Sequence, residues 1–257
     1  MTSERPVLVH LVPPLIPPDG LAGGVAVVID VLRATTVIVH ALAAGCKSVI
    51  PYAEIDEARR HAADLRPGGK VLLSGERHGV PIPGFDLGNS PGEFTPKVCK
   101  DATIVMTTTN GTRALARAVG ADRVLAAAFV NFSAVCEQLR VEPRPVHVVC
   151  AGREGTVSLD DTLLAGALVD VLSECGGHVK LNDAARLAWD CFENHGCCLR
   201  GALAVGAGGE QLLSLGYDAD IRAAAEVDRF TIVPELRREP LRLERGAVGI
   251  VQSHWPR

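Results

Sequence analysis

Short runs rich in Val and Ile alternate with alanine-rich stretches through the first two thirds of this chain. Each such pair is typical of a βα unit, and successive units build a parallel sheet that is covered by helices on both faces. The pattern therefore predicts an α/β protein with a three-layer α/β/α arrangement and a mostly parallel sheet. Strands are expected near residues 25–30, 47–51, 70–74, 103–107, 123–127 and 146–150, and helices near residues 34–44, 54–64, 112–119 and 132–140.

The last third of the chain has a different pattern. Helices are predicted near residues 160–174, 182–194 and 218–226, and a turn is predicted in the glycine-rich segment 201–209. The apolar runs Phe230–Val233 and Ala247–Val251 are expected to be strands. We expect a single domain over residues 1–257, and the change of pattern leaves open a second helical lobe from about residue 159.

Composition excludes several classes of protein. The net charge is −4 and the basic residues are scattered, so the footprint of a nucleic-acid-binding protein is missing. Prolines interrupt the N-terminal segment and no run of about 18 apolar residues follows, which predicts a cytoplasmic protein with no membrane contact. The 8 cysteines lack the spacing of a zinc knuckle, and we interpret them as reduced packing residues.

Polar and charged residues follow one predicted strand after another. The carboxyl ends of strands in an open parallel sheet share one edge, which is the usual place for a ligand crevice. The polar segments at residues 30–36, 75–90, 107–113 and 152–161 are therefore expected to line one cleft.

Asp30 stands at the end of the predicted strand near residues 25–30. A carboxylate at the end of a buried apolar strand is costly unless it is paired or binds a metal. A helix cap, or an ion pair between Asp30 and Arg33, is the structural alternative. The haloacid-dehalogenase pattern needs a second Asp two residues later, and Leu32 at that position excludes it.

Two polar loops favour the binding of an anion. In the segment 107–113, hydroxyl, amide and backbone N–H groups precede a predicted helix, whose N-terminus attracts phosphate or sulfonate. The loop over residues 84–91 carries Asn89 and Ser90, which can donate hydrogen bonds to a ligand. A capping role for Asn110, and a plain turn-rich connection at 84–91, are the alternatives.

Acidic residues accompany these donors. Asp160 and Asp161 open a predicted helix, where they also complement the helix dipole. Together with Asp30, Glu76 and Glu154 they form an oxygen-only set, and Mg²⁺ prefers carboxylates, water and substrate phosphate as its ligands. We therefore expect a magnesium site beside the anion site.

These segments resemble the 2-phosphosulfolactate phosphatase family, the ComB-like proteins of coenzyme M biosynthesis. The resemblance is carried by Ile29–Thr36 (IDVLRATT), Gly75–Arg77 (GER), Gly84–Pro91 (GFDLGNSP), Thr107–Ala114 (TTTNGTRA), Cys150–Gly155 and Ser158–Thr162, which occur in this order. It implies a ComB-like α/β fold of its own kind and a Mg²⁺-dependent phosphatase that converts 2-phospho-3-sulfolactate to 3-sulfolactate and phosphate.

The motifs and the resemblance together predict three groups of site residues. The catalytic group is Asp30, Glu76 and Asp161; the substrate-binding group is Arg33, Arg77, Asn89, Ser90, Thr108, Thr109, Asn110 and Gly111; the metal ligands are Asp30, Glu154, Asp160 and Asp161. Asp30 either attacks phosphorus or binds Mg²⁺. Two alternatives to this function stay open: another small anionic phosphomonoester as substrate, and a non-catalytic anion-binding protein. The sequence also leaves open a homo-oligomeric state.

Overall fold

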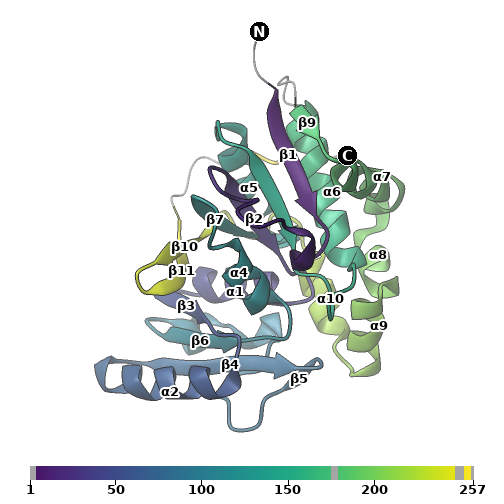
Figure 1. Cartoon of the computed structure of the whole chain (residues 1–257). Coiled ribbons are helices and arrows are strands. Elements are labelled where there is room, and N and C mark those ends of the chain that lie inside the picture. Colours follow the sequence, from purple (N-terminus) through teal and green to yellow (C-terminus); the bar gives the residue numbers. More distant parts are fainter. Residues whose placement is uncertain (1–3, 175–178, 247–251, 256–257) are drawn as a thin grey trace.

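An eleven-stranded sheet forms the middle layer of the protein in the computed structural model, which describes residues 4–174, 179–246 and 252–255 (Figure 1). The strand order is β5-β4-β6-β3-β11-β10-β7-β2-β8-β1-β9. The strands are β1 (Arg5–His10), β2 (Val25–Ile29), β3 (Ser48–Pro51), β4 (Val71–Arg77), β5 (Val80–Pro81), β6 (Thr103–Thr107), β7 (Arg123–Ala127), β8 (Val146–Cys150), β9 (Val179–Leu181), β10 (Pro234–Arg238) and β11 (Leu241–Arg245).

Helices cover both faces of this sheet. They are α1 (Ala34–Ala43), α2 (Ile55–Leu65), α3 (Pro96–Cys99), α4 (Gly111–Ala118), α5 (Phe132–Arg140), α6 (Leu159–Glu174), α7 (Asp183–His195), α8 (Leu199–Val205), α9 (Ala207–Ser214) and α10 (Asp218–Ala224). Within the described residues, no helix has both the length and the apolar character needed to cross a bilayer.

The sheet consists of two parallel blocks. β4, β6 and β3 pair in parallel, and so do β7, β2, β8, β1 and β9. The antiparallel hairpin β10–β11 lies between the blocks, where Glu235 pairs with Leu125 and Leu243 pairs with Val49. The prediction of a mostly parallel sheet is confirmed, but the hairpin that joins the two blocks was not predicted.

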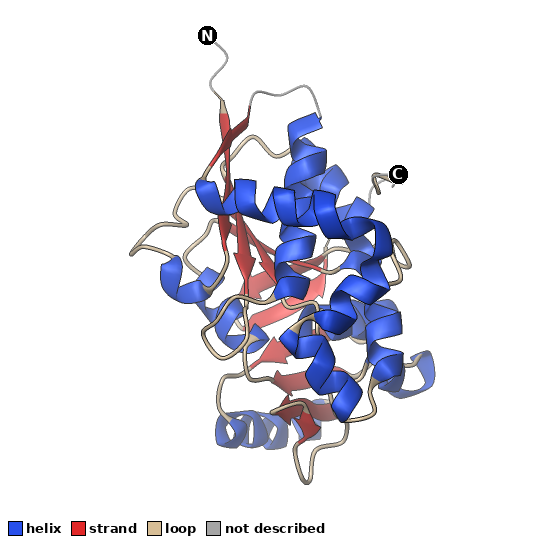
Figure 2. Cartoon of the chain, turned by 90° about the vertical axis from the view of Figure 1, so that its right-hand side faces the viewer, coloured by secondary structure: helices blue, strands red, loops and turns tan. Residues whose placement is uncertain are grey.

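Strand β2 explains why the protein has three layers. All its residues are buried, and their side chains alternate between the two faces. Val25, Val27 and Ile29 pack in one core with α5, α6 and α7, whereas Ala26 and Val28 pack in a second core with α1 and α4. Figure 2 is viewed from the side of the C-terminal helices and shows them in front of the strands.

Two predictions for the C-terminal third are wrong. The segment 201–209 is helical on both sides of Gly206, where α8 ends and α9 begins. A Cβ on Gly209 would lie 2.0 Å from the carbonyl oxygen of Leu203, so a glycine is needed where the two helices meet. The glycines of this segment allow close helix packing and do not form an extended turn. Residues 230–233 precede the strand, which begins at Pro234. The strand expected over 247–251 lies outside the described residues.

Candidate active site

One pocket opens where strands of both blocks end. Its volume is about 610 Å³, including the space that is open to solvent. The four polar segments predicted to share a cleft all contribute to it, and α9 closes one side. Its lining is Asp30, Leu32, Arg33, Glu76, His78, Gly79, Asn89, Thr108, Thr109, Asn110, Gly152, Arg153, Glu154, Ser158, Asp160, Asp161, Gly208, Gln211 and Leu212.

Asp30 follows the last residue of β2 and is 8% exposed. Its Oδ1 accepts a hydrogen bond of 3.1 Å from the backbone N–H of Ala34, so this oxygen caps the start of α1. Its Oδ2 faces the start of α4, where a Cβ on Gly111 would lie only 2.6 Å away. A glycine at this position therefore lets the carboxylate approach the helix N-terminus.

The pKa of Asp30 is raised to about 7, and burial is the largest cause. The hydrogen bond from Ala34 opposes this shift, while the nearby carboxylates of Asp160 and Glu76 increase it and Arg33 again lowers it. Desolvation favours the neutral form of a buried acid unless a cation compensates its charge. The surroundings of Asp30 thus favour the neutral acid, and a bound cation would instead stabilise the charged carboxylate.

Asp161 connects the ends of two neighbouring strands. Its Oδ1 accepts from the N–H of Val31 at 2.9 Å, and its Oδ2 accepts from the N–H of Gly152 at 3.0 Å. Asp160 accepts from the N–H of Leu32 at 3.1 Å and from the hydroxyl of Ser158. Burial raises the pKa of both carboxyl groups. Both acids at the start of α6 therefore hold the backbone around Asp30.

Glu76 has a similar position on the other block. Its Oε1 accepts from the N–H and the hydroxyl of Thr109, at 2.8 and 3.0 Å, and its Oε2 accepts from the N–H of Gly79 at 2.7 Å. The residue is 7% exposed. Glu76 therefore fixes the loop before α4 relative to the turn between β4 and β5.

Asn89 has a buried amide oxygen that accepts no hydrogen bond from the described residues. The residue is 4% exposed and lines the pocket. Buried polar atoms are nearly always paired, so an orphan atom in a pocket needs an explanation such as a ligand or ion. Oδ1 of Asn89 is therefore a natural contact for a bound molecule or ion.

Comparison with known proteins agrees with this site. A sequence model of the 2-phosphosulpholactate phosphatase family matches residues 10–239. The chain belongs to this family. The resemblance seen in the sequence motifs is confirmed, and the matched region contains every residue that lines the pocket.

Several curated relatives carry the name "Probable 2-phosphosulfolactate phosphatase". The one from Symbiobacterium thermophilum is 43% identical over 218 residues, which are 85% of this chain and 93% of the relative. Those from Prochlorococcus marinus (strain MIT 9313) and Caldanaerobacter subterraneus are each 40% identical, over 84% and 82% of this chain and 90% and 87% of the relative. The family is thus one of phosphatases, which are phosphoric monoester hydrolases.

The guanidinium of Arg33 has contacts on several sides. Its Nη1 donates to Oδ2 of Asp220 at 2.6 Å and to Oγ of Ser90 at 3.2 Å, and its Nη2 donates to the carbonyl of Gly79 at 2.9 Å. The guanidinium also lies 4.7 Å from the centre of the Tyr217 ring. Arg33 therefore pairs with Asp220, and the ion pair with Asp30 that we considered from the sequence is not formed.

Three residues of the predicted substrate-binding group do not line the pocket. Arg77 donates to the carbonyls of Glu76 and Ala53 and to the hydroxyl of Thr107, at 2.8, 2.9 and 2.9 Å. Ser90 accepts a hydrogen bond from Arg33, and Gly111 lies beside Asp30. The other predicted residues line the pocket, with Glu154 on the rim, where its side chain is 55% exposed.

Sequence reasoning missed the contribution of the C-terminal helices. Asp220 of α10 is 187 positions from Arg33, and Gln211 of α9 lies in a segment with no motif. His78 and Arg153 lie inside the segments 75–90 and 152–161 that were predicted to line the cleft, but neither was chosen as a site residue. No local signal identifies Asp220 or Gln211.

The charges in the pocket fit a divalent cation. Five carboxylates line the pocket, whereas its arginines are only Arg33 and Arg153, and Arg33 is already paired with Asp220. No three His, Cys, Asp or Glu side chains among the described residues form a metal cluster by themselves. Mg²⁺ does not need one, because it is usually bound by one or two carboxylates, waters and substrate phosphate.

Two oxygens have the character that such an ion requires. Oδ2 of Asp30 and Oδ1 of Asn89 belong to buried residues of the pocket, and neither accepts a hydrogen bond from the part of the chain that the structure describes. The oxygens of Glu76, Asp160 and Asp161 all accept hydrogen bonds already. The donor set therefore fits Mg²⁺ with few protein ligands.

Proposed function

We propose that this protein is a Mg²⁺-dependent phosphatase that hydrolyses 2-phospho-3-sulfolactate to 3-sulfolactate and phosphate. The observation that carries the proposal is the pair of acceptor oxygens without a donor, Oδ2 of Asp30 and Oδ1 of Asn89, in an acidic pocket beside the start of α4. The family and the names of the relatives support the choice of substrate.

In this proposal Asp30 and Asn89 hold the Mg²⁺ ion. When bound, the ion supplies electrostatic stabilisation of the charge on the phosphoryl oxygens. Asp160 and Asp161, which the sequence predicted as ligands, do not bind the ion in this proposal. Their oxygens instead accept hydrogen bonds from the backbone N–H groups of Leu32, Val31 and Gly152. In this proposal Asp30 is a ligand of the ion and not the nucleophile, because its Oδ2 and Oδ1 of Asn89 are the buried pocket acceptors without a donor among the described residues.

The loop before α4 binds the phosphate group. A helix leaves its first N–H groups without partners inside the helix, and its dipole favours an anion at that end. Oγ1 of Thr108 accepts from the N–H of Thr112 at 3.2 Å, and Glu76 holds Thr109. The loop is thus fixed before substrate arrives, so binding does not have to order it.

Phosphate release by the purified protein tests the proposal. We expect release from 2-phospho-3-sulfolactate, loss of that activity in EDTA, and recovery on addition of Mg²⁺. A second measurement is independent of turnover: Mg²⁺ should raise the melting temperature of the protein, since a ligand of the native state stabilises it. Full activity in the chelator would contradict the metal proposal.

A wider panel addresses the alternatives left open by the sequence. Faster phosphate release from another small anionic phosphomonoester would support the phosphatase activity but assign it a different substrate. Binding of these compounds without release of phosphate would indicate an anion-binding protein. The cytoplasmic location, a homo-oligomeric state and the lack of nucleic-acid binding stay predictions, which fractionation, sedimentation and binding assays can check.

A further inference from the structure

Arg153 differs from the other basic residues that line the pocket. Its Nη2 donates to Oε1 of Gln211 at 3.1 Å, and it forms no ion pair with any described residue. Arg33 is paired with Asp220 at 2.6 Å, and Nδ1 of His78 lies 3.5 Å from a carboxylate oxygen of Glu154. Arg153 thus brings to the pocket a positive charge that forms no ion pair with a described residue, and this charge lowers the pKa of Asp160.

The backbone from Arg153 to Thr156 forms a tight, hydrogen-bonded turn. Arg153 and Thr156 exchange two backbone hydrogen bonds of 2.9 Å, and the residues between them, Glu154 and Gly155, have φ values of 51° and 80°. Positive φ at both central positions is typical of a tight type I′ turn. The N–H of Glu154 also donates to Oδ1 of Asn110 at 3.0 Å, which ties this turn to the start of α4.

Gln211 orients the guanidinium without neutralising it. Its Nε2 donates to the carbonyl of His78 at 3.0 Å, so its Oε1 is the atom that faces Arg153. An acidic residue at this position would form an ion pair with Arg153 and neutralise the charge of the guanidinium. A neutral amide instead holds the side chain in place and leaves the other N–H donors of the guanidinium for a ligand.

We propose that Arg153 binds the sulfonate of the substrate and that Gln211 is the positioning residue for Arg153. The inference rests on the proposed function. In 2-phospho-3-sulfolactate the carboxylate is attached to the carbon that carries the phosphate ester, whereas the sulfonate is one carbon further away. The guanidinium of Arg153 is half-buried and contacts Gln211 of α9, whereas the loop proposed to bind the phosphate leads into α4. A guanidinium fork matches the oxygens of a tetrahedral anion such as a sulfonate.

A pair of substrates isolates the sulfonate. 2-Phospholactate keeps the phosphate and the carboxylate but has a methyl group where the natural substrate has CH₂SO₃⁻. Arg153→Ala should lower kcat/KM for 2-phospho-3-sulfolactate about 10- to 100-fold, mainly through KM, because a hydrogen bond to a charged group is worth that factor. The same variant should change kcat/KM for 2-phospholactate less than about twofold.

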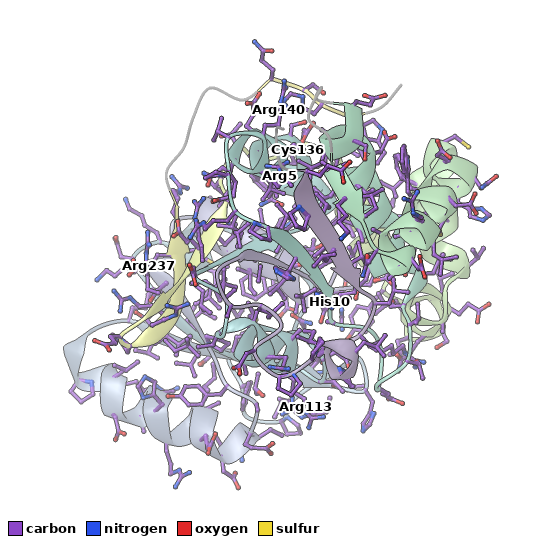
Figure 3. The ribbon with its side chains drawn as sticks, turned by 45° about the horizontal axis from the view of Figure 1, so that its top comes forward. Arg5, His10, Arg113, Cys136, Arg140 and Arg237 are labelled. Atoms are coloured by element: carbon purple, nitrogen blue, oxygen red, sulfur yellow. The ribbon has the colours of Figure 1, made fainter. Side chains whose placement is uncertain are left out.

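Two further variants test the role of Gln211. Gln211→Ala should cause a smaller loss that is again restricted to the sulfonate substrate, and Gln211→Glu should cause a loss close to that of Arg153→Ala because it pairs with the guanidinium. Arg140→Ala is the matched control. Arg140 is exposed at the end of α5, and Figure 3 shows it at the opposite end of the view from Arg113, which follows the pocket loop.

The outcomes distinguish this inference from the proposed function. No phosphate release from either compound by the wild type would overturn the proposed function. Release from both, with Arg153→Ala equally harmful for both or harmless for both, would overturn the sulfonate assignment alone. Calorimetric binding of 3-sulfolactate and lactate gives a readout without turnover: Arg153→Ala should weaken the binding of 3-sulfolactate only.

Discussion

Arg33 and Asp220 form a buried ion pair of 2.6 Å, with side chains only 3% and 7% exposed, across 187 positions of the chain. Arg33 follows strand β2 and Asp220 belongs to α10. Removing one partner of a buried pair leaves an uncompensated charge away from water. The pair thus ties the C-terminal helices to the pocket.

The first prediction concerns this pair. Asp220→Ala should reduce the free energy of unfolding by about 3–5 kcal/mol, because it leaves the Arg33 charge buried without a partner. Urea denaturation measures this change. Arg200→Ala, which removes an exposed ion pair with Asp218, should change stability by less than about 1 kcal/mol. Equal effects of the two substitutions would contradict the importance of burial.

The second prediction concerns Asp30. Asp30→Asn should lower kcat by orders of magnitude, and Mg²⁺ should no longer raise the melting temperature, because the amide keeps the shape but loses the charge that holds the ion. The melting temperature without Mg²⁺ should stay close to that of the wild type or rise, since burial disfavours the charged carboxylate. Near-normal turnover would show that Asp30 has a structural role.

Gly111 provides a test of the close approach between β2 and α4. In Gly111→Ala the new Cβ would lie 2.6 Å from Oδ2 of Asp30 and 2.5 Å from Cβ of Ala34, so these groups must move. We expect a large loss of phosphatase activity and a loss of stability of about 1–3 kcal/mol, as in other overpacked sites. Phosphate release and urea denaturation measure the two effects.

Gly120→Ala is the control for this substitution. Apart from Gly120 and its chain neighbours, no heavy atom of the described residues lies within 4 Å of the position that its Cβ would occupy, and its φ is not in the left-handed region. The control should therefore retain activity and stability. If Gly111→Ala behaved like Gly120→Ala, the pocket would tolerate a displacement of Asp30.

The last prediction concerns acid stability and rests on a buried histidine pair. Nε2 of His10 lies 3.2 Å from Nδ1 of His147, and the two rings stack with centroids 5.5 Å apart. The pKa of His10 is lowered from 6.5 to about 4, mainly by burial and also by the nearby His147 and Arg117. Burial also lowers the pKa of His147.

The sign of the pH effect follows from these shifts. Between about pH 6.5 and pH 4 the unfolded chain binds a proton at His10 that the folded protein does not bind, so stability falls as the pH is lowered through this range. The contribution of His10 is up to about 3 kcal/mol, at 1.36 kcal/mol for each pKa unit. Urea unfolding at several pH values should show that the free energy of unfolding falls less between pH 6.5 and pH 4 for His10→Gln than for the wild type. Parallel curves for the two proteins would contradict the assignment.

Local patterns in the sequence determined most elements of this fold. β2, β6, β7 and β8 lie where the apolar runs predicted them, and α1, α4 and α5 follow as expected. Each of these elements depends on hydrophobic periodicity and on residues a few positions apart, which a single sequence displays. The order of polar segments also predicted that Asp30, Glu76 and Asn110 would share a pocket, because the ends of parallel strands meet.

Only the tertiary structure decided which oxygens and charges in the pocket are free. The sequence contains several acids, but it does not show that backbone amides occupy both oxygens of Asp161 while Oδ2 of Asp30 accepts no hydrogen bond from the described residues. It contains several arginines, but their partners Asp220 and Gln211 come from helices far along the chain. Hydrogen bonds and ion pairs depend on distances of a few ångströms, and packing of distant segments sets these distances.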